Sequence, residues 1–531
     1  MSPTTLGYLC RRLGPVAFML TLVASCASAP PAGAPRAHAP RAPAPLVYTI
    51  RVPAPSTRTF DVDVVVPTDG RDSVVLYMPI WSPGMYTLMS YGDRVTAFTA
   101  RAADGAPLGV RHPDGGHWVV QTGGRPAVTV TYTVSAPRGS NLSNGATDTS
   151  LVVVGPATYV GLAGETSRPA EVRLVLPAGW RPAATSLAAA PGGAPNDFVA
   201  PDYDVLADSP ILAGTHMSSA AVTVGGVRHR WAYLGDAEWS AASAIAWLRP
   251  LLEEHRRFWG GTLPLHDYVF LNIVGAGPGS GVEHLNSVAI NTNGREPQTA
   301  EARFREASFL SHEYFHAMNV KRLRPVELGP FDYEHTPTTT GLWVAEGLTS
   351  YFGDLLAARS GLGDTHDWLA LTSRHIRDLQ SSPGRLVQTL EQASARMFER
   401  IPPNQRVDYY VKGPVVGLVL DAHIRKRTDG RRSMDDVIRL EYDRWSGSRG
   451  YTAEDFARTA SDAVGFDLAP LLHTLVASTE EVDYAEMLDW FGLRFAPNDD
   501  PARAWTLEVN PAATAAQRAH LAALLAPSGR R

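Results

Sequence analysis

Two histidines four residues apart are the part of this sequence best suited to chemistry. Leu310 to Pro325 reads LSHEYFHAMNVKRLRP and contains HEYFH. On a helix, residues i and i+4 lie on the same face, so His312 and His316 can reach one ion at about 2 Å from each nitrogen. Glu313 would then stand beside the open position of the ion. Because so short a pattern also arises by chance, a metal site requires a third ligand.

Helical spacing around this motif supports a metal site. The apolar residues Ala307, Leu310, Tyr314, Phe315 and Met318 follow the helical period. A second helix is predicted over Trp343 to Leu356, WVAEGLTSYFGDLL, and offers Glu346 as the third ligand. Two histidines and one glutamate leave the fourth position to water, as catalytic zinc sites require. Taken alone, the alternative for Glu346 is a solvated helix carboxylate.

The residue between the histidines has an obvious task at such a site. Zinc lowers the pKa of its bound water toward 7, and Glu313 can accept the proton and deliver it to a leaving amine. The competing serine chemistry lacks a G-x-S-x-G motif. Cysteine chemistry is excluded because Cys10 lies in a segment expected to be removed and Cys26 is expected to carry lipid.

A glycine-rich stretch, GAGPGSGVEHLNS from Gly275 to Ser287, follows a predicted strand. Its spacing matches neither G-x-G-x-x-G nor a loop that ends in G-K-[ST], so a nucleotide site is not indicated. We expect a loop that carries Glu283 near the metal, with a plain tight turn as the alternative.

The surrounding elements divide the chain. Residues 46–235 show period-two runs, such as FDVDVVV and AVTVTYTVSA, which predict an all-β N-terminal domain. Residues 236–495 are mainly helical, with one strong strand, YVFLNIV, and form the predicted catalytic domain. Residues 496–531 read as a short closing segment that ends in a helix.

The N-terminus indicates export. Arg11 and Arg12 precede the apolar segment Leu13 to Ala24, and Val23-Ala24-Ser25-Cys26 resembles a bacterial lipobox, so residues 1–26 are a predicted lipoprotein signal peptide. The alternative is an ordinary signal peptide. The Ala/Pro-rich residues 27–45 would be a tether. We therefore expect membrane attachment through lipid on Cys26, facing the periplasm of a Gram-negative bacterium.

Composition excludes other classes. The 531 residues are 44% hydrophobic and 19% charged, as in ordinary globular proteins, and the formal net charge is −5. Without a basic surface or a Lys/Arg run, we expect no nucleic-acid partner. The sequence does not predict an oligomeric state.

Taken together, five motifs resemble the glycyl aminopeptidase family of gluzincin metallopeptidases. They are, in order, YMPIWSPGMY (Tyr77 to Tyr86), GVEH, HEYFHAMNVKRLRP, WVAEGLTSYF and VDYYVKG (Val407 to Gly413). The resemblance implies a mainly α thermolysin-like catalytic domain behind the β domain. It also implies one zinc per chain, held by His312, His316 and Glu346, with Glu313 as general base.

Two further roles follow from the resemblance. Related aminopeptidases bind the α-amino group of the substrate through a glutamate, here Glu283, and stabilise the oxyanion through a tyrosine before x-K-G, here Tyr410. Both roles make chemical sense, because a carboxylate pairs with an ammonium and a phenol donates to an oxyanion. Tyr409 is the adjacent alternative to Tyr410.

The predicted function is thus a zinc aminopeptidase that releases small residues, Gly or Ala, from peptides with a free N-terminus. The size preference comes from the resemblance alone. One alternative is an endopeptidase or a broader aminopeptidase, and another is a non-catalytic peptide-binding lipoprotein, against which the intact Glu313 argues. Many members of the family carry a PDZ domain, but only about 35 residues follow Phe495, too few for that module.

Overall fold

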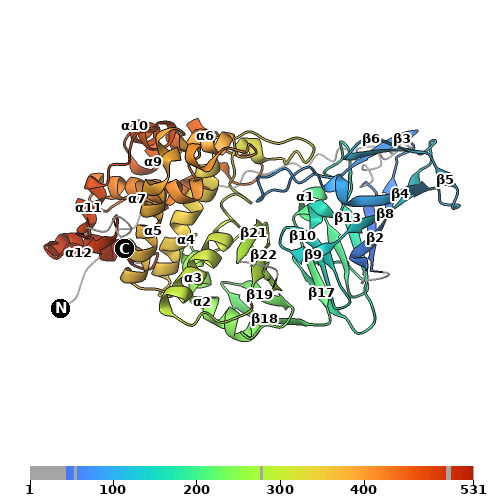
Figure 1. The fold of residues 1–531 in the computed structure, drawn as a ribbon, viewed down its shortest axis with the longest axis horizontal. Helices are drawn as coiled ribbons and strands as arrows, with labels where there is room; N and C mark the ends of the chain where they lie inside the picture. Colours follow the sequence, from blue (N-terminus) through green and yellow to red (C-terminus); the bar gives the residue numbers. More distant parts are fainter. Residues whose placement is uncertain (1–42, 53–56, 276–278, 498–503, 530–531) are drawn as a thin grey trace, which may run out of the picture. The chain divides into compact units, whose positions relative to one another are not determined.

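The computed structural model describes residues 43–52, 57–275, 279–497 and 504–529 (Figure 1). Ala44–Arg531 forms one compact unit. The predicted signal peptide and most of the predicted tether, including Cys10 and Cys26, lie outside the described residues. Within the described ranges, no helix has the length and apolar character needed to cross a bilayer.

Three sheets build the N-terminal β domain, as the period-two pattern predicts. The first has the order β15 (Ala188–Ala189), β16 (Asp197–Ala200), β13 (Ala170–Val175), β1 (Leu46–Arg51), β2 (Thr59–Pro67), β8 (Ala127–Ser135), β4 (Val95–Arg101) and β5 (Pro107–Leu108). The second has the order β14 (Arg181–Thr185), β17 (Ile211–Gly214), β11 (Ser150–Val153), β10 (Ser143–Ala146) and β9 (Pro137–Ser140). The third has the order β12 (Gly161–Leu162), β3 (Ser73–Tyr77), β7 (His117–Gln121) and β6 (Val110–Asp114). A short helix, α1 (Tyr203–Ala207), precedes β17.

A fourth sheet belongs to the catalytic domain. Its order is β18 (Met217–Val224), β19 (Val227–Leu234), β20 (Asp267–Val274), β22 (Ser287–Thr292) and β21 (Ser280–His284). β20 is almost continuously apolar because both faces are covered: Phe270 packs into the helical core and Leu271 into the core of the β domain. The expected boundary after residue 235 therefore falls between two paired strands of one sheet.

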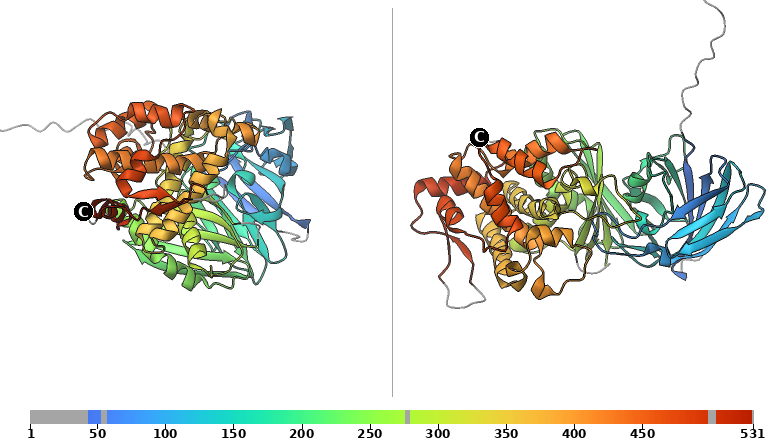
Figure 2. Two further views of the ribbon diagram at one scale, coloured as in Figure 1. Left: turned by 60° about the vertical axis from the view of Figure 1, so that its left-hand side comes forward. Right: turned by 90° about the horizontal axis from the view of Figure 1, so that it is seen from above.

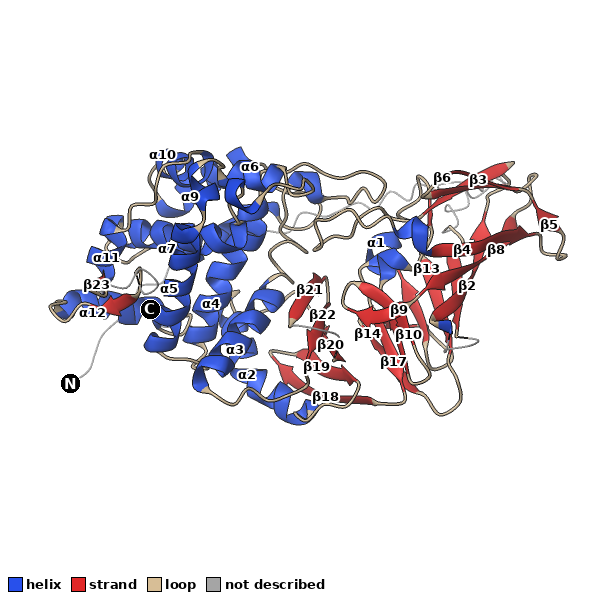
Figure 3. Cartoon of the chain, viewed as in Figure 1, coloured by secondary structure: helices blue, strands red, loops and turns tan. Residues whose placement is uncertain are grey.

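Helices dominate the catalytic domain outside this sheet (Figure 3). The helices are α2 (Ala241–Phe258), α3 (Ala300–Phe315), the π-helix η5 (Trp343–Leu348), α4 (Thr349–Arg359), α5 (Thr365–Ser381), α6 (Leu390–Ala395), α7 (Tyr409–Arg427), α8 (Met434–Trp445), α9 (Ala453–Val464), α10 (Ala469–Leu472), the π-helix η8 (His473–Ala477), α11 (Ala485–Phe491) and α12 (Ala515–Leu525). A two-stranded sheet, β23 (Leu493–Phe495) and β24 (Leu507–Val509), lies near the end. The predicted fold class, an all-β domain followed by a mainly α domain, is confirmed.

Two helices set the position of the metal-binding motif. The side chain of Thr299 accepts a hydrogen bond from the Ala302 backbone and starts α3, which ends one residue before His316. α3 packs along α4 and against β21. Figure 2 shows the chain from two further directions. Gly353 of α4 allows this approach, because a Cβ there would lie 3.1 Å from the Cα of His312. The single helix predicted over Trp343 to Leu356 is instead a π-helix continued by α4.

Candidate active site

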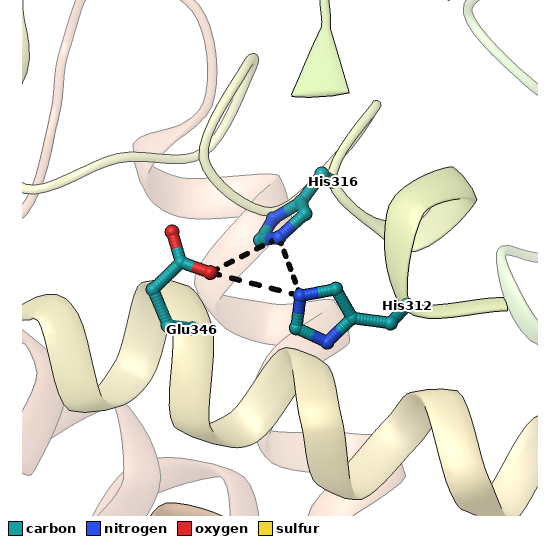
Figure 4. A group of neighbouring side chains, drawn as sticks. All are labelled: His312, His316 and Glu346. Carbon is teal, nitrogen blue, oxygen red and sulfur yellow. Dashed lines mark hydrogen bonds and ion pairs between the residues drawn. The ribbon is translucent and has the colours of Figure 1, made fainter. Parts of the chain in front are cut away.

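Three side chains bring their ligand atoms to one point (Figure 4). Nε2 of His316 lies 3.1 Å from Oε2 of Glu346, Nε2 of His312 lies 3.7 Å from the same oxygen, and the two nitrogens are 3.0 Å apart. Ligand atoms at about 2.1 Å from one ion in tetrahedral geometry lie about 3.4 Å from one another. The three donors thus have the identity and the spacing of a zinc site.

Hydrogen bonds fix the orientation of both imidazoles. Nδ1 of His316 donates to the carbonyl of Asn319 at 2.9 Å. The Ser350 hydroxyl donates to the carbonyl of Glu346 at 3.1 Å, so it accepts from Nδ1 of His312 at 3.2 Å. Because Nδ1 of each ring has its own hydrogen-bond partner, the Nε2 atoms face Glu346 and are the atoms that can bind a metal.

Asn319 links the end of α3 to the π-helix that carries Glu346. Its side-chain amide donates to the carbonyl of Val344 at 2.8 Å and to the hydroxyl of Thr349 at 2.9 Å. These two bonds hold η5 and the start of α4 beside the metal motif. The sequence singles out Asn319 only through the family motif, and the structure gives it this positioning role.

The surrounding charges favour a cation at this point. Although burial opposes it, the carboxylates of Glu346, Glu283 and Glu313 raise the pKa of His316 to about 10. Burial also opposes the ionisation of Glu346, yet His316 and His312 hold the pKa of Glu346 well below its usual range. The field that attracts a proton to this site attracts a divalent metal ion more strongly.

The carboxyl group of Glu313 lies against β21. Its side chain is buried, and a Cβ added to Gly281 would lie 2.3 Å from its carboxyl carbon. Burial raises the pKa of Glu313 to about 8. A carboxylate in this environment is a strong enough base to accept a proton from water.

Glu283 lies on β21 rather than on the predicted loop, which corrects that expectation. The strand pairs with β22 through the register Glu283 with Val288, and Gly281 with Ile290. Since Glu283 and Gly281 are two residues apart, both face the same side of the sheet as Glu313. The carboxylate of Glu283 is buried, and burial raises its pKa.

The β domain contributes two residues that the sequence does not assign to the site. A Cβ on Gly84 would lie 2.7 Å from Oε2 of Glu283, so the backbone of this loop contacts the carboxylate. The hydroxyl of Tyr86 donates to Oε1 of Glu346 at 3.3 Å. Both residues belong to the YMPIWSPGMY motif, and only its place among the ordered motifs could have suggested a role at the site.

A buried ionic contact fixes β21 against the β domain. Asp208, which follows α1, accepts from Nζ of Lys321 at 2.8 Å, from Nδ1 of His284 at 2.9 Å and from the backbone of Leu285 at 2.7 Å. Although burial opposes it, Lys321 and His284 lower the pKa of Asp208 to about 2. The contact joins the residue after Glu283 to the loop that follows the metal motif.

Tyr410 lies at the start of α7, next to the metal ligands. Its ring centroid is 6.1 Å from that of His312, and it is 37% exposed, whereas Tyr409 is buried. α7 reaches this position because it crosses η5 at two glycines: a Cβ on Gly413 would lie 2.3 Å from the Cα of Gly347. Asp408 caps the helix by accepting from the Tyr410 backbone at 2.8 Å. Of the two tyrosines, Tyr410 is the one that is accessible beside His312.

Comparisons with known proteins agree with this fold. Residues 305–416 match the family described as M61 glycyl aminopeptidase, and residues 47–215 match the peptidase M61 N-terminal domain. No curated protein matched the sequence. Among solved structures, an aminopeptidase N family protein from Idiomarina loihiensis is similar with a TM-score of 0.80 at 24% identity, over 84% of this chain and 78% of that one.

Similarity extends to a zinc enzyme of a second family. An M1 zinc metallopeptidase from Deinococcus radiodurans has a TM-score of 0.51 at 15% identity, over 82% of this chain and 94% of that one. A mutant of that enzyme bound to a Tyr-Ser-Ala substrate has a TM-score of 0.52, also at 15% identity, with the same coverage. Structures this distant show the fold alone, but the two matched domains together span more than half of the chain. This chain therefore belongs to the M61 glycyl aminopeptidase family of metallopeptidases.

Proposed function

We propose that this chain is a zinc-dependent aminopeptidase that releases Gly or Ala from the N-terminus of peptides. The observation that carries the proposal is the buried carboxylate of Glu283 on the strand that faces Glu313. A carboxylate held there can pair with the ammonium of a free N-terminus and place the first peptide bond beside the metal ligands.

Each charged group has one task in this proposal. When bound to His312, His316 and Glu346, zinc supplies the polarisation of the scissile carbonyl and the lowered pKa of water. Glu313 accepts the proton of the attacking water and passes it to the departing amine. The α-amino group of the substrate stays protonated throughout, because the carboxylate of Glu283 pairs with it.

Tyr410 is the proposed oxyanion donor. Its accessible position beside His312 supports this role over Tyr409, which is buried. A phenol donor in a partly dry site contributes on the order of 3 kcal/mol to a developing oxyanion. The rings of Tyr86 and Tyr410 both lie next to metal ligands. Their bulk supports a preference for a small first residue.

The decisive experiment compares free and acetylated peptides. Acetylation removes the ammonium and leaves the Glu283 carboxylate desolvated without a partner, which costs on the order of 2 to 5 kcal/mol. We expect kcat/KM to fall at least tenfold, and Glu283→Ala to depress cleavage of free peptides while zinc content is unchanged. Equal cleavage of both forms, with internal bonds cut, would favour the endopeptidase.

Metal analysis tests the ligand assignment separately. Protein prepared without chelators should contain about one zinc per chain. His316→Ala should lose the metal, whereas Glu313→Gln should keep it and lose turnover, because only the proton acceptor is removed. Full activity after zinc removal would reject the site.

We also propose that the protein is an exported lipoprotein anchored through Cys26. The support is the lipobox-like sequence behind a short apolar segment. The full-length protein should partition with membranes, and Cys26→Ser should release it or block its processing. Recovery of unlipidated wild-type protein from the soluble periplasm would contradict this proposal.

A further inference from the structure

A hollow of about 650 Å³ lies on the face of the catalytic sheet that α3 covers. Its apolar floor is formed by Trp231 and Tyr233 of β19, Ile290 of β22 and Phe309 of α3. Glu306 of α3 and Gly279, the residue before β21, also line the hollow. The hollow is therefore built partly from the helix that carries Glu313 and from the residue that precedes the strand of Glu283.

Strand register places this hollow beyond the catalytic centre. Along β21, Glu283 pairs with Val288 and Gly281 pairs with Ile290, which lines the hollow. Gly279, the residue before β21, also lines it. A substrate that extends from Glu283 past Gly281 therefore arrives at the hollow.

The spacing of residues along α3 also places the hollow on the side of Glu313 away from Glu283. Glu313 and Phe309 are four residues apart, and Phe309 and Glu306 are three apart, so the three side chains follow one face of α3. Glu306 lies about 10 Å from Glu313 along the helix axis, at 1.5 Å per residue. The hollow thus begins next to Glu313 and runs away from the amine-binding carboxylate.

The unpaired charge in this hollow is negative. Glu306 is partly buried and, among the described residues, makes no hydrogen bond or ion pair. The two lining cations each have a carboxylate partner outside the hollow, since Arg305 pairs with Glu301 and Arg295 with Glu238. Burial raises the pKa of Glu306, as for a carboxylate that lacks a cationic partner. A cation that enters the hollow would supply that partner.

We propose that this hollow binds the side chain of an arginine or a lysine in the leaving peptide, at the second or third residue of the substrate. The alkyl stem would pack on the apolar floor and the charged head would pair with Glu306. This inference rests on the proposed function, because it takes its direction from an N-terminus held by Glu283.

The reach of a peptide agrees with this assignment. An extended chain advances about 3.3 Å per residue, so the Cα atoms of the second and third residues lie roughly 2 to 6 Å beyond the cleaved bond. An arginine or lysine side chain spans about 6 to 7 Å and covers most of the remaining distance to Glu306. A neutral short side chain at either position leaves Glu306 without a partner.

The test uses peptide pairs that differ only in one charge. Alanyl peptides with a C-terminal amide carry either arginine or citrulline, its neutral isostere, at the second or at the third residue. For the wild type we expect kcat/KM about tenfold higher with arginine at one of these positions. Glu306→Gln should remove that preference. Glu306→Lys should reverse it, so that a peptide with glutamate at that position is cleaved faster than the peptide with arginine. Glu399→Gln is the control, because Glu399 is exposed and pairs with Arg396, and neither residue lines the hollow.

A minimal substrate separates this inference from the proposed function. Alanyl p-nitroanilide has no peptide side chain beyond the cleaved bond, so Glu306→Gln should leave its cleavage within twofold of the wild type. If the wild type does not cleave it, the proposed function fails and the inference with it. If the wild type cleaves it but does not distinguish arginine from citrulline at either position, the inference alone is overturned. An arginine preference that persists in Glu306→Gln also overturns it.

Discussion

Gly281→Ala is the perturbation that tests the geometry around Glu313 most directly. Gly281 lies on β21 with extended backbone, so alanine fits the conformation of the strand. The new Cβ, however, would lie 2.3 Å from both the carboxyl carbon and Oε1 of Glu313. Ordinary carbon contacts lie at about 3.5 to 4.0 Å. The carboxylate or the strand must therefore move by more than about 1 Å.

A displacement of this size is large for a general base. A misplacement of about 1 Å costs on the order of 100-fold in rate when the reacting groups are otherwise intact. We therefore expect kcat to fall about 100-fold. Zinc content should not change, because neither Gly281 nor Glu313 is among the three proposed ligands.

The assay is cleavage of alanyl p-nitroanilide, with zinc content and thermal melting measured on the same preparations. Gly279→Ala is the matched control, since it lies two residues away and a Cβ there meets no atom of the described residues within 4 Å. It should retain the wild-type rate. A Gly281→Ala protein that is fully active, or one that loses zinc in proportion to activity, would refute the reasoning.

Three further changes probe other contacts. Asp208→Asn should lower the free energy of unfolding at pH 7 by about 2 kcal/mol in denaturant titrations, because the folded pKa is about 2 against an ordinary value of 3.8. Because that pKa is depressed, the contribution of Asp208 to stability is complete above about pH 4. The difference in free energy of unfolding between variant and wild type should vanish as the pH falls through 2. A difference that does not change with pH would argue against the ionic contact. Tyr410→Phe should keep zinc and reduce kcat by about 100-fold, more than Tyr409→Phe does. Ser350→Ala should weaken zinc affinity by about 10- to 100-fold in chelator competition, because His312 loses its hydrogen-bond acceptor.

Local patterns predicted much of the fold. The alternation in FDVDVVV and AVTVTYTVSA corresponds to β2 and β8, where buried residues alternate with partly exposed ones. The apolar run YVFLNIV is β20, and its lack of alternation reflects a sheet covered on both faces. These features depend on neighbours a few residues apart, which a single sequence displays.

The composition of the site was less accessible to sequence reasoning. The four-residue spacing of His312 and His316 identifies them in the sequence. The hydrogen bond from Tyr86 to Glu346, however, joins residues that are 260 positions apart. Asp208 and Lys321 are an ordinary pair of charged residues until the fold brings them within 2.8 Å. Glu283 was predicted on a loop because glycines precede it, whereas pairing with β22 makes this segment a strand. Long-range contacts decided the positions of Tyr86 and Asp208, and pairing with the next strand decided that of Glu283.

The π-helix η5 has a consequence for how this segment tolerates changes in length. A π-turn holds about one residue more than an α-turn, and each residue rotates a helix by about 100°. Deleting Gly347 or Leu348, which lie between Glu346 and α4, would therefore convert the turn to regular α-helix and rotate Glu346 about the axis of α4, away from His312 and His316. A loop absorbs such a deletion, but here a shift in helical phase would dismantle the ligand set while leaving every ligand in the sequence.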